Sequence, residues 1–395
     1  MILAELIEEY ISGDWGNEEL STDTPNQVYC VRAADFVPIL SVDYTNIPIR
    51  YISNAAFNNK RLKEGDIVIE KSGGSPTQST GRVIIVTKEL LQNKPNLVCS
   101  NFCEAFRVKE GWNPFYVFTY LQFLYNQGVF FNFEGKTSGL KNLQMEQAFN
   151  SIDIPEQKSD ISILASIDEK IALNHKINIE LESLAKEMYD YWFIQFDFPN
   201  EEGKPYKSSG GKMVWNGELK REIPEGWNDG TLKDFLLIKN GRDHKNLSEG
   251  SYSVYGSGGK IRKVDNYLYD GESILIPRKG SLNNIMYVNE RFWTVDTMFY
   301  SEVQIKNSAL YVYYSIKDID FTKLNTGTGV PSMTTSRLYM IKTLIPSSLI
   351  LSNYDKVARN LYLQIKKEEE VIAELKSLRD YLLHLLMNGQ ITTKD

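Results

Sequence analysis

Two stretches decide the architecture of this chain: IDEKIALNHKINIELESLAKEMYDY at positions 167–191 and LYLQIKKEEEVIAELKSLRDYLLHL at positions 361–385. In both, the seam positions advance by 4, 3, 3, 4, 3, 4 and 3 residues, and the third position is polar. This spacing predicts two long helices, each with a narrow apolar seam as in a coiled coil. The predicted seams are Ile167, Ile171, Asn174, Ile177, Leu181, Leu184, Met188 and Tyr191, and Leu361, Ile365, Glu368, Val371, Leu375, Leu378, Leu382 and Leu385.

The segments that precede the two helices also correspond. TSGLKNLQMEQAFNSIDIP at 137–155 has a counterpart in TGVPSMTTSRLYMIKTLIP at 328–346, and both end in Ile-Pro. An acidic-Gly turn opens a β-branched strand at 64–69 and again at 270–276, and a basic, Gly/Ser-rich loop follows each strand. ISGDW at 11–15 pairs loosely with KNGRD at 239–243. The chain is therefore predicted to be an internal repeat of globule and helix.

Each globule mixes strands with turns and helices, so we expect an α/β (α+β) fold in two copies. Neither helix can bury its seam alone, and we expect the two to pack antiparallel. Predicted boundaries are 1–155 for the first globule, 156–198 for the central helix, 199–222 for a Pro/Gly/Ser-rich linker, 223–347 for the second globule and 348–395 for the C-terminal helix. A helix of about 30 residues is roughly 45 Å long, which exceeds one turn of B-DNA.

Composition limits the functional classes. The chain has 395 residues, a formal net charge of −7 and three cysteines, which are too few for a disulfide framework. We expect no membrane span, no secretory signal and a cytoplasmic location. Residues 1–155 carry 13 Lys and Arg against 18 Asp and Glu, a net charge of −5; residues 223–346 carry 15 against 13, a net charge of +2. Net charge alone does not exclude DNA binding, because basic residues can gather on one face.

Two short motifs suggest enzymatic activity, but neither fits. GKTS at 135–138 lacks the glycine that a phosphate-binding loop needs five residues earlier, where Phe130 stands. Asn113-Pro114-Phe115-Tyr116 lacks the second proline of an amino-methyltransferase motif and leads into an amphipathic helix. No metal-ligand set or catalytic triad can be assembled. We therefore expect no catalytic residues and no metal site.

Three segments resemble the specificity (S) subunit of type I restriction-modification enzymes. They are residues 167–198, residues 223–241 (IPEGWNDGTLKDFLLIKNG) and residues 372–391 (IAELKSLRDYLLHLLMNGQI). The resemblance extends over essentially the whole chain, although the first globule lacks the Pro-Glu-Gly-Trp lead that opens the second. It implies two target recognition domains that each bind one half-site in double-stranded DNA, with an unread gap set by the helix pair.

The resemblance also implies protein partners. The helices would dock two modification (methyltransferase) subunits, and restriction (translocase/nuclease) subunits would join them. S-adenosylmethionine, ATP and Mg are expected only on those partner subunits, with no cofactor on this chain. The alternative is a non-catalytic scaffold that bridges partner proteins through its helical hairpin without reading DNA.

Candidate DNA contacts lie in the repeated loops, where donor and acceptor side chains could meet base edges and where Lys and Arg could meet phosphates. In the first globule they are Lys71, Ser72, Ser75, Thr77, Gln78, Arg82, Thr137, Lys141 and Asn142. In the second they are Arg242, His244, Lys245, Tyr255, Lys260, Arg262, Lys263, Arg278, Lys279, Ser281, Asn283, Thr328, Ser332 and Thr334. Gln78 and Asn283 suit adenine, and Arg82 or Arg278 suits guanine. For any single residue, a plain solvent-exposed turn is an equally good interpretation.

Overall fold

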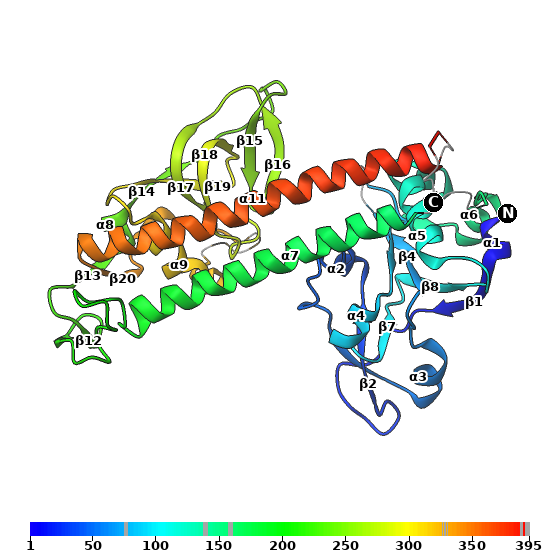
Figure 1. Cartoon of the computed structure of the whole chain (residues 1–395), viewed down its shortest axis with the longest axis horizontal. Helices are drawn as coiled ribbons and strands as arrows, with labels where there is room; N and C mark the ends of the chain where they lie inside the picture. The colour runs from blue at the N-terminus through cyan, green and yellow to red at the C-terminus, as the bar shows by residue number, and fades with distance from the viewer. Residues whose placement is uncertain are drawn as a thin grey trace. The chain divides into compact units, whose positions relative to one another are not determined.

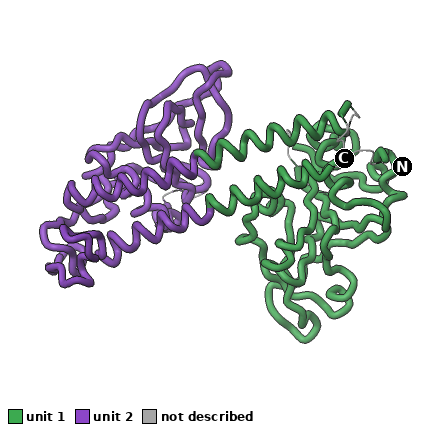
Figure 2. The backbone as a smooth tube through the Cα atoms, in the orientation of Figure 1, with its two compact units in different colours: residues 1–178, 367–395 green, residues 179–366 purple. Residues whose placement is uncertain are grey.

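The chain folds as two compact units (Figures 1 and 2). The computed structural model describes residues 1–74, 78–136, 141–156, 161–325, 327, 329, 331–387 and 390–391. Unit 1 contains residues 1–178 and 367–395, and unit 2 contains residues 179–366. The long helices α7 (Ser162–Tyr189) and α11 (Ser348–Met387) each contribute to both units. Among the described residues, no helix is both long and apolar enough to cross a membrane.

Unit 1 is built on a four-stranded antiparallel sheet of order β1-β8-β4-β6, with two three-stranded sheets of order β3-β2-β7 and β5-β10-β9 beside it. Its strands are β1 (Ile7–Ser12), β2 (Asn26–Val31), β3 (Ile49–Ile52), β4 (Ile67–Glu70), β5 (Ser72–Gly73), β6 (Val83–Ile85), β7 (Leu97–Cys99), β8 (Cys103–Val108), β9 (Glu134–Lys136) and β10 (Lys141–Leu143). Its short helices are α1 (Leu3–Leu6), η1 (Ala33–Asp35), α2 (Phe36–Leu40), α3 (Asn54–Lys60), α4 (Lys88–Asn93), α5 (Pro114–Asn126), η2 (Val129–Phe133) and α6 (Met145–Ser151).

The core of unit 1 forms on both sides of β4, whose residues are all buried. Ile67 and Ile69 pack with the aromatic helix α5, while Val68 faces the second cluster under α2 and β7. This alternation is that of a strand covered on both faces. All three cysteines are buried free thiols, and burial raises the pKa of Cys30 and Cys103 to about 12 and that of Cys99 well above its usual value.

Unit 2 is built on a six-stranded sheet of order β14-β19-β17-β18-β15-β16. Two two-stranded ladders, β11-β12 and β13-β20, complete its β-structure in the described residues. The strands are β11 (Met213–Asn216), β12 (Arg221–Pro224), β13 (Asn228–Thr231), β14 (Leu236–Asn240), β15 (Tyr252–Gly256), β16 (Gly259–Val264), β17 (Tyr269–Pro277), β18 (Met286–Thr294), β19 (Met298–Val303) and β20 (Lys342–Ile345). The helices are the π-helical turn η3 (Asp190–Ile194), α8 (Leu232–Phe235), α9 (Ala309–Lys317), η4 (Phe321–Leu324) and α10 (Thr335–Tyr339).

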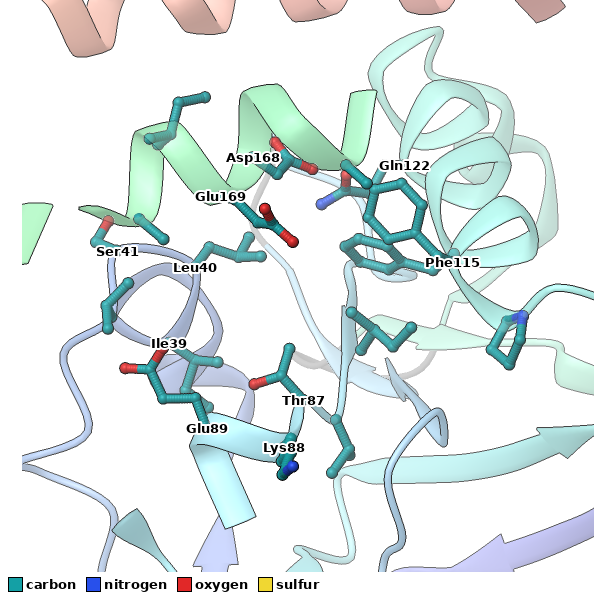
Figure 3. A pocket seen from close by; sticks show the side chains of 18 of the residues that line it. Ile39, Leu40, Ser41, Thr87, Lys88, Glu89, Phe115, Gln122, Asp168 and Glu169 are labelled. Carbon is teal, nitrogen blue, oxygen red and sulfur yellow. The ribbon is translucent and has the colours of Figure 1, made fainter. Parts of the chain in front are cut away.

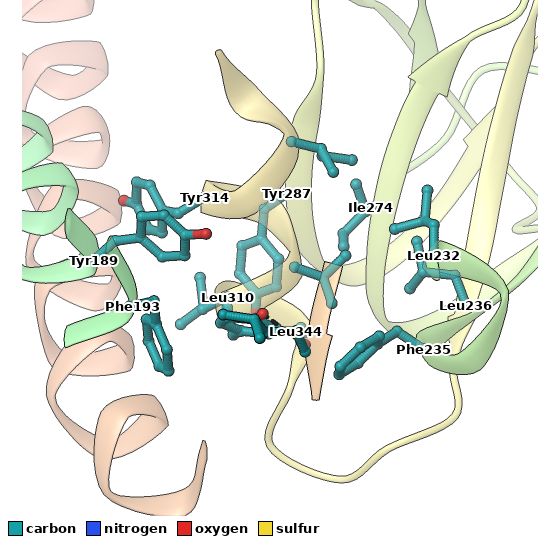
Figure 4. Close-up of a cluster of buried hydrophobic side chains, with 14 of the residues drawn as sticks. Tyr189, Phe193, Leu232, Phe235, Leu236, Ile274, Tyr287, Leu310, Tyr314 and Leu344 are labelled. Atoms are coloured by element: carbon teal, nitrogen blue, oxygen red, sulfur yellow. Dashed lines mark hydrogen bonds between the residues drawn. The ribbon is translucent and has the colours of Figure 1, made fainter. Parts of the chain in front are cut away.

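The core of unit 2 is rich in aromatic side chains (Figure 4). Leu310 and Tyr314 of α9 lie between the sheet and the end of α7, where the ring centroid of Phe193 is 4.6 Å from that of Tyr311 and 4.8 Å from that of Tyr354. Aromatic side chains bury large apolar areas, and tilted pairs of this kind add to that stabilisation. The core therefore joins α9, the end of α7 and the start of α11 into one body.

Residues 199–222, which the sequence analysis predicts to be a linker, contain regular secondary structure. β11 pairs with β12 in this region, and the ring of Tyr206 stacks on that of Phe198 with 4.7 Å between centroids. Met213, Val214 and Leu219 pack against the core of unit 2. The apolar side chains are few and lie among many Gly, Ser and Lys residues, and this composition is typical of a linker.

The predicted seam of α7 is correct in its first half and shifts in its second. Ile167 and Ile171 expose 8% and 4% and face α11, but Ile177 and Leu184 expose 37% and 50%. Ala185, next to Leu184, exposes 1% and packs into the core of unit 2, so the buried face of α7 changes where its packing partner changes.

The seam of α11 shows a similar exception. Ile365 and Ile372 are buried, whereas the predicted Leu378 exposes 46%. Its neighbour Arg379 faces α7 instead, with 3.1 Å between its Nη1 and Oδ1 of Asp168. Figure 1 shows the two helices running antiparallel within unit 1, where Asp168 of α7 forms an ion pair with Arg379 of α11. Of the other predicted seam residues, Asn174 is buried, Tyr191 is exposed, and the rest are partly buried: Leu181, Met188, Leu361, Glu368, Val371, Leu375, Leu382 and Leu385.

Candidate nucleic-acid interface

The two units share a three-stranded framework in matching register. In unit 1, Ser12 of β1 pairs with Glu104 of β8, and Glu70 of β4 pairs with Cys103. In unit 2, Asn240 of β14 pairs with Phe299 of β19, and Pro277 of β17 pairs with Met298. The strands β1-β8-β4 therefore correspond to β14-β19-β17. The residues that follow β4 and β17 occupy equivalent positions.

The loop after the central strand is anchored identically in both units. In unit 1 the backbone N–H groups of Lys71 and Ser72 donate to the carbonyl oxygen of Phe102, at 2.8 and 3.0 Å. In unit 2 the N–H groups of Arg278 and Lys279 donate to the carbonyl oxygen of Thr297, at 2.8 and 3.1 Å. A glycine follows each pair with positive φ, +145° at Gly73 and +88° at Gly280, a backbone region that favours glycine. Lys71 thus corresponds to Arg278, Ser72 to Lys279, and Phe102 to Thr297.

A second segment crosses this loop in each unit. The N–H of Leu143 donates to the carbonyl of Lys71 at 2.8 Å, and the N–H of Met333 donates to that of Arg278 at 2.9 Å. Asn142 pairs with Ser72, and Ser332 bridges to Lys279. The structure therefore matches residue 142 with 332, whereas the sequence alignment matched 142 with 333.

The turn after the first strand completes the arrangement. The N–H of Asp14 donates to the carbonyl of Cys99 at 2.7 Å, and the N–H of Arg242 donates to that of Thr294 at 2.9 Å. A Cβ on Gly13 would lie 2.0 Å from the carbonyl oxygen of Ser100. A Cβ on Gly241 would likewise lie 2.1 Å from the carbonyl oxygen of Val295. Both glycines are required by this close backbone contact.

These segments form one loop cluster in each unit. Loop cluster 1 comprises residues 13–15, 71–73, 100–102 and 141–142. Loop cluster 2 comprises residues 241–245, 257–260, 278–281, 295–297 and 331–334. The tip of the β15–β16 hairpin is held by Asn284, whose Nδ2 donates to the carbonyl oxygen of Ser257 at 2.9 Å. Of the predicted contacts, Ser75, Thr77, Thr137 and Thr328 lie outside the described residues.

The predicted cations of unit 1 are each held by a carboxylate. Lys71 Nζ lies 3.5 Å from Glu104 Oε2, and Lys141 Nζ lies 2.8 Å from Glu134 Oε2. Arg82 donates from Nε and Nη2 to both oxygens of Glu70 at 2.8 Å, and Glu70 exposes only 1%. The guanine-reading hypothesis for Arg82 is therefore wrong in this structure, because its bidentate donor face is already used. Gln78 is exposed, and the hydroxyl of Ser72 donates to Oδ1 of Asn142.

Loop cluster 2 has a different charge distribution. Arg242, Lys245 and Lys279 are exposed, and in the part of the chain that the structure describes none of their side chains forms an ion pair within 4 Å, although Oδ1 of Asp243 accepts the backbone N–H of Lys245 at 3.0 Å. The guanidinium of Arg278 lies 6.0 Å from the ring centroid of Phe299. Lys260 is half-exposed and 4.0 Å from Glu290. Lys263 on β16, Ser281 and Thr334 are exposed as well, and the hydroxyl of Thr334 hydrogen-bonds that of Ser336.

Four predicted contacts of unit 2 use their polar atoms inside the unit. Tyr255 is buried and donates its hydroxyl to Glu290 at 2.6 Å; burial and this bond raise its pKa. Arg262 donates to Nδ1 and the carbonyl of His244, and to the carbonyl of Leu247. Asn283 accepts from the N–H of Phe321 at 2.8 Å. Their side chains position loops, and Asn283 is unavailable as an adenine reader in this conformation.

Comparison with known proteins identifies the framework. The sequence matches the type I restriction modification DNA specificity domain twice, over residues 19–183 and 224–368. The chain belongs to this family of DNA specificity domains. Each match lies mainly within one of the two units that carry equivalent loop clusters, and the internal repeat predicted from the sequence is confirmed.

Two relatives of this specificity-domain chain are informative. The specificity subunit of the type I restriction enzyme MjaIX from Methanocaldococcus jannaschii is 26% identical over 269 residues, which is 61% of this chain. The chain spans 60% of the length of that curated relative. A crystal structure of a type I restriction-modification system S subunit from M. genitalium aligns with a TM-score of 0.52 at 16% identity, covering 98% of this chain and 95% of that one. The predicted fold class, two mixed α/β domains with two long helices, is confirmed.

One specificity-domain feature was missed by sequence reasoning. Phe102 exposes 55% of its surface within loop cluster 1, between β7 and β8. Its neighbour Asn101 accepts the N–H of Trp15 at 3.1 Å, which fixes the turn. The motif search followed polar and basic loops, so an apolar side chain between two cysteines gave no signal.

Unit 1 also contains a hollow of about 850 Å³ (Figure 3). Leu40 and Phe115 face each other across it, beneath Asp168 and Glu169 of α7. Glu64, which precedes β4, is part of the lining, so the hollow lies at the opposite end of β4 from loop cluster 1. Its walls are mainly apolar, and its charged residues are of both signs, so it does not extend the nucleic-acid interface.

Proposed function

We propose that this chain is the DNA specificity subunit of a type I restriction-modification system. Each unit binds one half-site of a bipartite target through its loop cluster. The observation that carries the proposal is the double match to the specificity domain, together with a basic residue, Lys71 or Arg278, at the same anchored position in both units. Basic side chains at such positions bind phosphates, while neighbouring side chains contact base edges.

The two long helices set the unread gap between the half-sites. α7 has 28 residues and α11 has 40, which correspond to about 42 and 60 Å at 1.5 Å per residue. A continuous helix is a stiff spacer, and one turn of B-DNA is about 34–36 Å. The half-sites are accordingly expected at a fixed separation.

The chemistry resides on partner subunits in this proposal. Two modification subunits bind the helical region and carry S-adenosylmethionine, and restriction subunits with ATP and Mg complete the complex. This chain contributes recognition and assembly rather than catalysis. A specificity subunit that scaffolds an enzyme needs exposed apolar surface on its helices, and Leu173 of α7 and Leu363 of α11 expose 50% and 56%.

The test is selection of DNA from a random duplex pool by the chain assembled with its modification subunits. Enrichment of two short half-sites separated by a fixed gap is expected. Enrichment of one continuous site, or of no sequence at all by the assembled complex, would refute the proposal and favour a scaffold that bridges proteins only.

A further inference from the structure

The equivalent loop clusters differ at two positions that the shared framework brings to the surface. Ser72 in unit 1 corresponds to Lys279 in unit 2, and Phe102 corresponds to Thr297, because the same backbone hydrogen bonds join each pair. The position of Lys71 and Arg278 is basic in both. A difference at equivalent positions in one framework points to a difference in what each cluster contacts.

The first difference concerns free positive charge. In loop cluster 1, Lys71 and Lys141 each lie within 3.5 Å of a carboxylate oxygen, so much of their charge is already neutralised. In loop cluster 2, Arg242 and Lys279 are exposed, and neither side chain has an ion pair within 4 Å among the described residues, whereas the exposed Lys245 lies beside Asp243, whose Oδ1 accepts the Lys245 backbone N–H at 3.0 Å. An unneutralised cation gains more by contacting a phosphate and by releasing its counterion from DNA.

The second difference concerns apolar surface. Phe102 presents a half-exposed ring from a turn whose carbonyl accepts two N–H groups, so the backbone beneath the ring is fixed. An aromatic ring contacts bases by packing on a thymine methyl or by stacking on an unstacked base. Neither contact requires charge. Thr297, at the same place in unit 2, offers only a small side chain.

We propose that the two units divide the work of binding DNA. Loop cluster 2 supplies most of the salt-sensitive phosphate contacts through Arg242 and Lys279. Loop cluster 1 derives sequence preference from an apolar contact between Phe102 and a base. This inference rests on the proposed function, because it assigns roles within the two recognition surfaces.

The first experiment measures how DNA affinity of the assembled complex depends on salt. Each phosphate contact contributes about −0.9 to the slope of log K against log salt concentration. Lys279→Ser is expected to make the slope less steep by about 0.9, and the reciprocal Ser72→Lys to make it steeper by about the same amount. Lys306→Ser, an exposed lysine beyond the far end of β19, is the matched control and should leave the slope unchanged.

The second experiment measures base preference by selection from the random pool. Phe102→Thr is expected to weaken the preference at one or two positions of one half-site, leaving the other half-site, the gap and the salt slope unchanged. Thr297→Phe is the reciprocal variant and should add a preference in the other half-site. Phe102 is exposed, so unchanged thermal unfolding will confirm that the variants fold.

The outcomes separate the two proposals. If the wild-type complex selects a bipartite site but Phe102→Thr selects the same site with the same preference, the role of Phe102 is refuted. An unchanged slope for Lys279→Ser refutes the role of loop cluster 2, and non-specific duplex DNA suffices for that measurement. If the wild-type complex selects no bipartite sequence, the proposed function itself fails.

Discussion

Arg82→Ala is expected to loosen unit 1 without changing which bases are read. Glu70 exposes 1% of its side chain and Arg82 exposes 21%, and two hydrogen bonds of 2.8 Å join them. Removing the guanidinium leaves a buried carboxylate without its partner, which costs about 3–5 kcal/mol. Because Arg82 is partly solvated, we expect the lower end of that range, about 3 kcal/mol, or roughly a 150-fold larger opening equilibrium.

Amide hydrogen exchange measures this effect where it arises. Protection of the β4 and β6 amides, Ile67–Glu70 and Val83–Ile85, should fall by about two orders of magnitude in Arg82→Ala, while that of β17 stays the same. The double variant Glu70→Gln, Arg82→Met removes both charges and should recover most of the protection, because no buried charge is left unpaired. Unchanged protection in Arg82→Ala, combined with an altered base in one selected half-site, would refute the structural role.

Three further perturbations test the framework, the buried thiols and the helical gap. Gly13→Ala should destabilise unit 1 by about 2–3 kcal/mol, because the added Cβ would lie 2.0 Å from a backbone oxygen. Gly258→Ala is the control: its added Cβ has no other atom within 4 Å, so the free energy of unfolding should change by less than about 0.5 kcal/mol in a thermal unfolding measurement. Burial raises the pKa of all three thiols, so they ionise at lower pH in the unfolded chain than in the folded one. The free energy of unfolding should therefore fall from about pH 8.5 upward, by up to about 4 kcal/mol per pH unit for the three thiols together. A urea-denaturation midpoint that does not change between pH 8 and 10 would contradict this. Inserting four residues after Asn178 and four after Lys366 lengthens each helix by about 6 Å. In selection from the random pool, the gap between the half-sites should widen by about two base pairs while both half-sites stay the same. A gap of unchanged length would show that the helices do not set the spacing.

The sequence predicted the features that have a local signature. The two long helices and the basic loops after β4 and β17 follow from residue types at short spacing. The acidic-Gly turn is present at Glu64-Gly65, but Asp270 and Gly271 lie inside β17 and pair with β18, so the second predicted turn is wrong. The register of the second crossing segment was wrong by one residue, because the hydrogen bond from Leu143 to Lys71 and its counterpart from Met333 involve backbone atoms only. Side-chain similarity contains no information on such a match.

The candidate site was less predictable than the fold. Arg82 was assigned to DNA because it stands in a Gly/Ser-rich loop; its ion pair with Glu70 depends on the pairing of β4 with β6, which brings the two residues together across 12 positions. Asn283 was assigned to adenine for the same reason, although Phe321, 38 residues later, uses its side-chain oxygen. Long-range pairing decides whether a polar loop residue is available, and no local pattern reports it.

The anchoring of the loops by backbone atoms has an evolutionary consequence. The bonds to the carbonyls of Phe102 and Thr297 do not depend on the side chains at positions 72, 102, 279 or 297. Substitutions there leave the hydrogen bonds that hold the loop in place, so they cost little stability. If the proposed function holds, a new DNA preference can therefore arise by single substitutions in one unit while the other unit keeps its own half-site.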